Sequence, residues 1–449
     1  MSPKNLFKIA ALLVVLALSA CLRTGVTEEA LPEAVLPQGT VELEIISTDS
    51  FIDTYGAYTL VGEVINHGTG PATQVELTVE LKDQAGVSLL TDLNGNLLPS
   101  VIKNLLLDTL APGQSCPFAF TFDALPAAPA SYSVVVSGFQ LGVLNRPEMD
   151  TVNVQIIDNG SGWFYLSGDL LNQSNQWVRV DGLAGAVLDA SGKVLSAGWS
   201  GTFSSTLAPA GDVNGRDRTP FLIAFANPGP EVSLWRVYWD ATVDNSLTDY
   251  PIQSAVTNSY FDQYGSYHLV GWATNLADQP LTVMLVSGLS SESGSVVDAS
   301  VNTLPVPIAP GASQPFNISS FSNVNFDVDQ ASLVRNHQIL VDLLYTSPPN
   351  SQTLELVPEQ EQVTRDVSTW LVSGSFTNST DRVLRDAIAV VEVLDPQGNL
   401  VTSDYNYVLI EEPLQPGSTA SYEVYLYLDP FVDASGFSAS TKIYGTVSE

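Results

Sequence analysis

The chain has 449 residues, of which 48 are acidic and 16 basic, so its net charge at pH 7 is −32. Such an acidic surface repels the phosphates of nucleic acid, and this excludes nucleic acid as a partner. Two cysteines cannot supply a disulfide framework, so we expect the stability of the chain to come from packed apolar cores.

The first twenty residues predict an export signal and not a membrane-spanning helix. Lys4 and Lys8 form a basic head, residues 9–17 are apolar, and Leu18-Ser-Ala-Cys21 closes the segment. A helix over residues 9–20 would be about 18 Å long, well short of a hydrocarbon core roughly 30 Å thick. A basic head, a short apolar stretch and small residues at the end are typical of a cleaved signal peptide.

The segment Leu18-Ser-Ala-Cys21 resembles the lipobox of bacterial lipoproteins. In that family the cysteine receives a diacylglycerol and the chain is cut before it. The resemblance implies that residues 1–20 are removed and that Cys21 becomes a lipidated N-terminus. We therefore expect an extracytoplasmic protein of the bacterial cell envelope, anchored in the outer membrane or at the cell surface. Ordinary secretory cleavage beside an incidental cysteine is the alternative.

Residues 21–40 show no sustained periodicity and predict a flexible spacer. After the spacer one phrase recurs four times: an aromatic residue, alternating apolar residues, a glycine and, four positions later, an asparagine. A repeat of about 100 residues predicts four copies of one domain, at residues 41–150, 151–251, 252–350 and 351–449. The glycine and asparagine pairs are Gly62/Asn66, Gly168/Asn172, Gly271/Asn275 and Gly374/Asn378.

Each copy predicts the same strands and turns. Apolar residues two and four positions before the glycine, and two after it, share one face of a strand. The asparagine is expected to end that strand in a turn, since its side chain suits turns and it tolerates a left-handed backbone. A turn such as Asp83-Gln-Ala-Gly86 predicts a hairpin, and in the third copy Ser291 replaces the aspartate. A strand that opens with Pro-Phe follows in the first three copies.

Short alternating strands, regular turns and the absence of a helical period predict an all-β chain of four tandem immunoglobulin-like β-sandwiches. From Gly62 to Gly417 the pattern resembles the FxLYD family and related immunoglobulin-like modules of bacterial envelope proteins. Stretches such as Val79-Glu-Leu-Lys-Asp83 keep the aliphatic residue and the aspartate of that family but not its aromatic residue. The resemblance implies no catalytic residues.

The first and third copies are especially alike. Residues 50–62 and 259–271 are identical at eight of thirteen positions, including Tyr55 and Tyr264. This similarity predicts a duplicated two-domain unit, in which the junction between the first and second domains resembles that between the third and fourth.

The sequence does not predict an enzyme. The three histidines, of which His268 is expected on the outer side of its strand, occupy non-equivalent positions without metal-ligand spacing. The closest approach to a nucleophile elbow, Gly198-Trp-Ser200-Gly-Thr202, lacks the final glycine.

Two further places are candidate sites. Asp212, Asn214 and Asp217 lie in a loop expansion of the second copy, and their oxygens resemble the start of a calcium loop; a plain polar loop is the alternative. Trp163 alternates with inward-facing residues, so we expect an exposed ring that could stack on a sugar or a protein, with edge packing as the alternative. Cys116 is expected outside the core.

These patterns favour a lipid-anchored envelope protein that binds or spaces without catalysis. Its expected partners are the membrane, through the lipid, and an unidentified protein or glycan. One alternative is a carbohydrate-binding accessory lipoprotein that reads glycans through its tryptophan-rich second copy. The other is a stalk made rigid by calcium, the one cofactor that the sequence suggests.

Overall fold

A computed structural model describes residues 39–447, apart from 124, 144, 159–161, 201, 230–231, 247–250, 321–333, 347–352, 367 and 411. The described residues form 29 strands and no α-helix, so the all-β prediction is confirmed. The described residues include no helix that is long and apolar enough to cross a membrane. The expected signal segment, residues 1–20, lies outside the described residues, as do Cys21 and the spacer up to residue 38.

The first quarter of the chain forms one sandwich of two main sheets. One sheet has the strand order β1-β2-β8, and the other has the order β6-β3-β7 with β9 also paired to β3. The strands are β1 (Leu43–Ile52), β2 (Tyr58–Asn66), β3 (Ala72–Lys82), β4 (Leu90–Thr91), β5 (Leu97–Leu98), β6 (Val101–Asn104), β7 (Thr109–Leu110), β8 (Ser115–Phe122) and β9 (Ser131–Leu141).

The second quarter repeats this plan, with the sheets β10-β11-β15 and β13-β12-β14, β16 also pairing with β12. Its strands are β10 (Met149–Asp158), β11 (Trp163–Asn172), β12 (Val178–Leu188), β13 (Val194–Ser200), β14 (Thr206–Leu207), β15 (Arg218–Ala226) and β16 (Leu234–Val243).

The third and fourth quarters form the sheet pairs β17-β18-β21 with β20-β19-β22, and β24-β25-β28 with β23-β29-β26-β27. The strands are β17 (Ile252–Phe261), β18 (Tyr267–Asn275), β19 (Leu281–Ser290), β20 (Val296–Thr303), β21 (Ser313–Ser319), β22 (Asn336–Thr346), β23 (Thr353–Leu356), β24 (Pro358–Arg365), β25 (Thr369–Thr377), β26 (Leu384–Leu394), β27 (Leu400–Tyr407), β28 (Thr419–Tyr427) and β29 (Ser438–Val447). We call the four units the first to the fourth sandwich.

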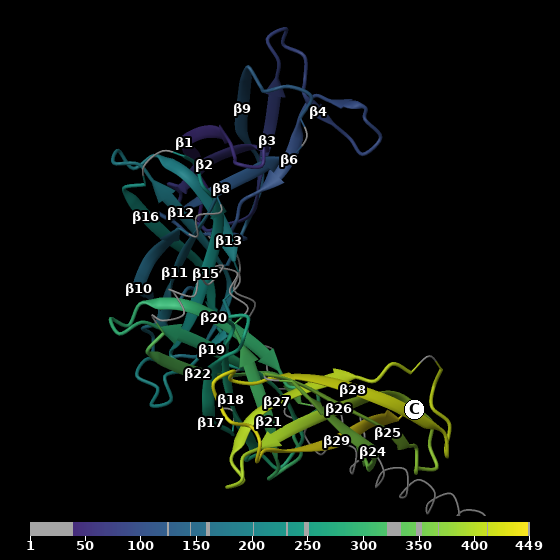
Figure 1. Ribbon diagram of the computed structural model, residues 1–449. Helices are drawn as coiled ribbons and strands as arrows, with labels where there is room; N and C mark the ends of the chain where they lie inside the picture. The colour runs from purple at the N-terminus through teal and green to yellow at the C-terminus, as the bar shows by residue number, and fades with distance from the viewer. Residues whose placement is uncertain are drawn as a thin grey trace, which may run out of the picture.

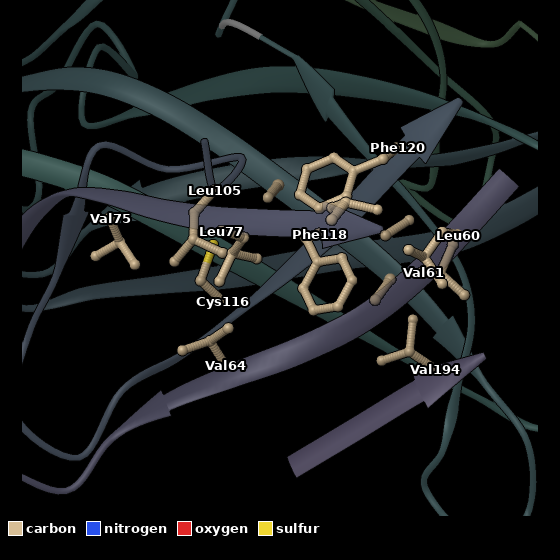
Figure 2. Close-up of a cluster of buried hydrophobic side chains, with 14 of the residues drawn as sticks. Leu60, Val61, Val64, Val75, Leu77, Leu105, Cys116, Phe118, Phe120 and Val194 are labelled. Carbon is tan, nitrogen blue, oxygen red and sulfur yellow. The ribbon is translucent and has the colours of Figure 1, made fainter. Parts of the chain in front are cut away.

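The recurring glycine is explained by an aromatic ring on the neighbouring strand. Gly62 on β2 lies directly opposite Phe118 on β8, and a Cβ at Gly62 would overlap both that ring and the carbonyl oxygen of Ser47 in the bulge of β1. Figure 2 shows Phe118 in the core of the first sandwich. The same pair occurs in every sandwich, as Gly62/Phe118, Gly168/Phe221, Gly271/Phe316 and Gly374/Tyr422.

The recurring asparagine ties its strand end to a distant loop. Asn66 is fully buried, and its Nδ2 donates to the carbonyl oxygens of Gly70 (2.9 Å) and Leu110 (3.0 Å). The strand does end at this asparagine, as expected, but the backbone there is not left-handed: among the residues that the structure describes, the non-glycine ones with positive φ are Gln74, Asn153 and Gln360. Asn172, Asn275 and Asn378 make the equivalent pairs of bonds.

The predicted hairpin turns are confirmed, with one addition. Gly86 has a φ of 78°, and Asp83 Oδ1 accepts from the backbone N–H groups of Ala85 and Val87. In the first sandwich this turn leads into an extra hairpin, β4–β5, before the next long strand begins. The position expected for Cys116 was wrong: its side chain points into the core beside Phe118, where burial raises the thiol pKa to about 12.

The sandwiches are stacked sheet against sheet. Strand β13 of the second sandwich contacts β1, β2 and β8 of the first. In the same way β20 of the third sandwich contacts β10, β11 and β15 of the second, and β27 of the fourth contacts β17, β18 and β21 of the third. We call these three contact regions the first, second and third joints. The first and fourth sandwiches consequently lie at opposite ends of an elongated molecule (Figure 1). Side chains of the second sandwich complete the core of the first, among them Val194 (Figure 2).

Candidate functional site

Trp163 lies in the joint between the first two sandwiches. Its indole Nε1 donates to the hydroxyl of Tyr55 at 3.1 Å, and the two ring centroids are 6.3 Å apart. Trp163 is half-buried, whereas Tyr55 is 67% exposed. The exposed platform therefore consists of two aromatic rings from two sandwiches, and not of Trp163 alone.

The loop that contains Asp212, Asn214 and Asp217 is closed by its own arginine. The carboxylate of Asp212 accepts from the Arg216 guanidinium, with an Oδ1–Nη2 distance of 2.9 Å, and this partner lowers the pKa of Asp212. Asp217 Oδ2 accepts from the N–H of Gly211 at 2.9 Å. The described residues contain no cluster of three or more His, Cys, Asp or Glu side chains that could hold a metal ion. The calcium hypothesis therefore gains no support from this geometry.

The same loop reaches the third sandwich. Gln338 Nε2 donates to the carbonyl oxygen of Gly215 at 3.1 Å. A cavity of about 570 Å³ lies beside this contact, between the loop residues Asn214 and Arg216 and the third sandwich. Its wall there includes Ile252, Leu276, Ile339 and Val341.

A buried carboxylate organises the first joint. Glu63, the residue after the recurring glycine, is 1% exposed, and it accepts hydrogen bonds from Arg236 Nη1 (3.2 Å), the Tyr238 hydroxyl (2.9 Å) and the Ser115 hydroxyl. Burial and this carboxylate raise the pKa of Tyr238. Three donors around one carboxylate satisfy a charge that would otherwise be costly to bury.

The second joint is held by bonds to one backbone carbonyl. Gln155 Nε2 and the Ser167 hydroxyl both donate to the carbonyl oxygen of Val296, each at 2.7 Å. Pro220 also packs against Gly288: a Cβ added there would stand 3.4 Å from the proline ring, in ordinary van der Waals contact.

The third joint buries a histidine. His268 lies on the outer side of its strand, as expected, but this side is buried in the joint and the residue is only 4% exposed. Its Nε2 lies 3.2 Å from Asp262 Oδ2, and its ring stacks on Tyr260. The Tyr260 hydroxyl donates to the carbonyl oxygen of Tyr427 at 2.6 Å. This histidine–aspartate pair is enclosed between two sandwiches, so its arrangement serves the joint and offers no open surface to a substrate.

The first and third joints, which the sequence predicts to be similar, share one aromatic contact but differ in the residues of the sheets that meet there. Tyr55 contacts Trp163 across the first joint, and the equivalent Tyr264 contacts Tyr427 across the third, with ring centroids 5.7 Å apart. The residue after the recurring glycine differs, however, because it is Glu63 in the first joint and Trp272 in the third.

Sequence reasoning missed the residues that build these joints. Glu63, Ser167 and His268 lie on the outer side of a strand, and in a single sequence such positions look like solvent-exposed ones. One signal was present: the Pro-Phe pair occurs in three copies and is missing from the fourth.

No family model and no curated protein matches the chain. The solved structures that match the chain include the following two. Red sea bream transglutaminase is 10% identical, with 45% of this chain and 32% of that one covered and a TM-score of 0.14. Native E. coli alpha-2-macroglobulin is 9% identical, with 90% and 28% covered and a TM-score of 0.12. The chain spans about a third or less of either protein, and TM-scores this low carry no argument about fold or function.

Proposed function

We propose that the chain is a lipid-anchored protein of the bacterial envelope, with immunoglobulin-like sandwiches, that acts as a rigid, non-enzymatic spacer or binding element. Cys21 would carry the lipid, residues 22–40 would form the tether, and the four sandwiches would hold their outermost surfaces away from the membrane. An unidentified protein or glycan would bind at those surfaces.

The observation that carries the spacer role is the construction of the joints. Each of the three joints buries one sheet of a sandwich against a strand of the next, and each is crossed by hydrogen bonds between side chains and backbone. Domains joined by a flexible linker alone move independently by default, whereas large apolar interfaces oppose such motion. The joints therefore support a stiff stack.

Lipid attachment can be tested directly in cells that produce the full-length chain. We expect labelled fatty acid to be incorporated into the protein and the protein to sediment with membranes, and Cys21→Ser to abolish both. Ordinary secretory cleavage, the alternative, would instead leave the protein unlabelled and soluble, which would overturn the anchored role.

A second candidate is a glycan-binding protein, favoured by the adjacent rings of Tyr55 and Trp163. Aromatic faces stack on sugar rings, and the two rings come from sandwiches that the first joint holds together. A glycan array probed with the full chain tests this candidate. We expect Tyr55→Ala to abolish sugar binding and Trp199→Ala, which removes another exposed ring of the second sandwich, to leave it intact. Binding that is absent, or that is equally insensitive to both changes, would rule the candidate out.

A further inference from the structure

The four sandwiches use one pair of complementary faces at all three joints. The outgoing face belongs to the sheets β1-β2-β8, β10-β11-β15 and β17-β18-β21, and the incoming face belongs to the sheet that contains β12, β19 or β26. The incoming face of the first sandwich and the outgoing face of the fourth meet no other sandwich in the described structure. Comparing these two end faces with the six joined ones shows what each end could accept.

On the incoming face, the outward positions of the central strand are small or apolar in the joined sandwiches. Counted back from the hairpin turn, the second sandwich has Gly182, Ala184, Ala186 and Leu188, all buried. The third has Met284, Val286, Gly288 and Ser290, and the fourth has Ile388, Val390, Glu392 and Leu394. The one charged residue, Glu392, is paired with Lys442 at 2.9 Å.

The first sandwich departs from this pattern at the same positions, which are Glu76, Thr78, Glu80 and Lys82. The side chain of Glu76 is exposed, and that of Glu80 is half-buried and paired with Lys82 at 2.6 Å. Glu80 takes the place of Glu392 and, like it, has a lysine partner, but no joined face carries a charge at the position of Glu76. Burying this strand under another sandwich would strip water from the carboxylate of Glu76.

The outgoing face shows the same contrast. In the joined sandwiches the residue after the recurring glycine lies opposite a buried proline, in the pairs Glu63/Pro117, Asp169/Pro220 and Trp272/Pro315. In the fourth sandwich the corresponding pair is Ser375/Ser421, and Ser421 is exposed.

The next outward pair on this face completes the contrast. Val61/Ala119, Ser167/Leu222 and Val270/Asn317 carry no charge in the joined sandwiches. Their counterpart in the fourth sandwich is Ser373/Glu423, in which Glu423 is exposed.

We infer that the two end faces are caps: the incoming face of the first sandwich and the outgoing face of the fourth reject a further sandwich, including one from a second copy of this chain. End-to-end contact between two copies would bring Glu423 towards Glu76, two carboxylates of like charge, beside the Glu80–Lys82 pair. Stacked-repeat proteins need such polar outer faces at their ends to stay soluble. The stack thus has a fixed length of four units. The inference deepens the proposed spacer role and rests on it.

The test uses two variant chains, each with one end face changed to resemble a joined face, and asks whether the two associate when mixed. In one chain Glu76→Gly, Thr78→Ala, Glu80→Ala and Lys82→Leu copy the incoming face of the second sandwich. In the other, Ser421→Pro and Glu423→Ala copy the outgoing face of the first; proline is tolerated because β28, like β8, is an edge strand. Both are full-length chains with Cys21→Ser, studied by sedimentation velocity.

We expect each chain alone, and the parent, to sediment as a 48.0 kDa monomer up to about 100 µM. The mixture is expected to form a one-to-one complex, because each chain retains one cap. Conservative changes, Glu80→Asp mixed with Glu423→Asp, serve as the matched control and are expected to give no complex.

A mixture that stays monomeric, although both chains melt like the parent, would overturn the inference. So would a parent chain that associates end to end by itself and loses that association on Glu80→Lys. If the fourfold change unfolds the first sandwich, the double change Thr78→Ala/Glu80→Ala takes its place in the same mixture. Loss of lipid attachment would leave these outcomes unchanged, so the spacer role and the caps can fail separately.

Discussion

The recurring glycines differ in how closely their surroundings approach them. At Gly62 and Gly271 a carbonyl oxygen from the bulge of the neighbouring strand would overlap an added Cβ. At Gly168 and Gly374 the corresponding oxygen lies 3.0 Å from where that Cβ would stand. The aromatic partner can shift by a few tenths of an ångström, whereas the backbone of a paired strand cannot do so without losing hydrogen bonds.

Alanine at these glycines should therefore destabilise the sandwiches unequally. We expect Gly62→Ala to lower the free energy of unfolding of the first sandwich by about 3 kcal/mol or more, since overpacking a core next to fixed backbone is costly. Gly168→Ala should lower that of the second sandwich by roughly half as much. Calorimetric melting of the two variants beside the parent measures the difference. Equal losses would contradict the expectation that the closer contacts around Gly62 make its replacement more costly.

Asp298 is a buried acid whose protonation affects the third sandwich. It is fully buried on β20; its Oδ1 accepts from the N–H of Ala299, and its Oδ2 finds no hydrogen-bond partner in the described structure. Burial raises its pKa from 3.8 to about 7. The equivalent residue of the second sandwich is Ser196, whose hydroxyl donates to the carbonyl oxygen of Ala226 at 2.8 Å.

Because the folded pKa of Asp298 lies above the ordinary value, the fold favours the protonated form. The stability of the third sandwich is therefore expected to fall as the pH rises from about 4 to about 7, by up to roughly 1.4 kcal/mol per pH unit, and to change no further above pH 7. Asp298→Ser should raise the melting temperature at pH 8 and have little effect at pH 4. A gain of equal size at both pH values would contradict the role of ionisation.

At the scale of the strand, features that depend on residues close together in the sequence were predictable, and features that depend on distant residues were not. The turns were predictable because each depends on local geometry: Gly86 has the positive φ that its turn requires. The recurring glycines were visible as a repeat but their cause was not, because the ring opposite Gly62 belongs to Phe118, far along the chain. The hydrogen bonds of the recurring asparagine were not predictable, since Asn66 bonds to Leu110, and no local pattern reveals a partner that far along the chain. Cys116 failed for a related reason, because its alignment with the polar Gln314 suggested a polar site, and both side chains are in fact buried.

The joints could not be predicted from the sequence, for a different physical reason. Period-two patterning separates the core face of a strand from its other face, but it does not say whether water or a second sheet covers that other face. Glu63 therefore resembled an ordinary surface acid. The sequence predicted Trp163 as an exposed ring, whereas the structure has it half-buried and hydrogen-bonded to Tyr55 of the preceding sandwich.

Two ion pairs cross the first joint in different surroundings and should differ in strength. Glu63 is almost fully buried, whereas Lys193 and Asp49, 2.8 Å apart, are both more than a third exposed. We expect Glu63→Ala to destabilise the joint by about 3 kcal/mol, because the buried hydroxyl of Tyr238 loses its partner. Lys193→Ala should cost less than about 1 kcal/mol.

Calorimetry of the full chain measures this contrast. Glu63→Ala should lower the melting temperature of the first sandwich and separate its transition from that of the second, whereas Lys193→Ala should leave the trace unchanged. The importance assigned to the buried carboxylate would be refuted if the two variants melted alike.

For the molecule as a whole, joints of this kind imply a fixed distance between its ends. The β4 hairpin projects from the first sandwich, far from the fourth (Figure 1). Leu93, between β4 and β5, is fully exposed, and Phe431, between β28 and β29, is 94% exposed. Cysteines at these two positions can take spin labels, while Cys116 is buried in the core and protected from them.

We expect a single narrow distribution of distances between labels at positions 93 and 431, in a chain that also carries Cys21→Ser. The distribution should not change between low and high salt, because the joints depend on buried apolar contacts and hydrogen bonds more than on exposed charges. A matched chain with a Gly-Ser insertion after Pro147, between β9 and β10, should give a broad distribution, since the inserted residues behave as a flexible coil. A parent distribution as broad as that of the insertion chain would show that the sandwiches move independently and would remove the physical basis of a spacer.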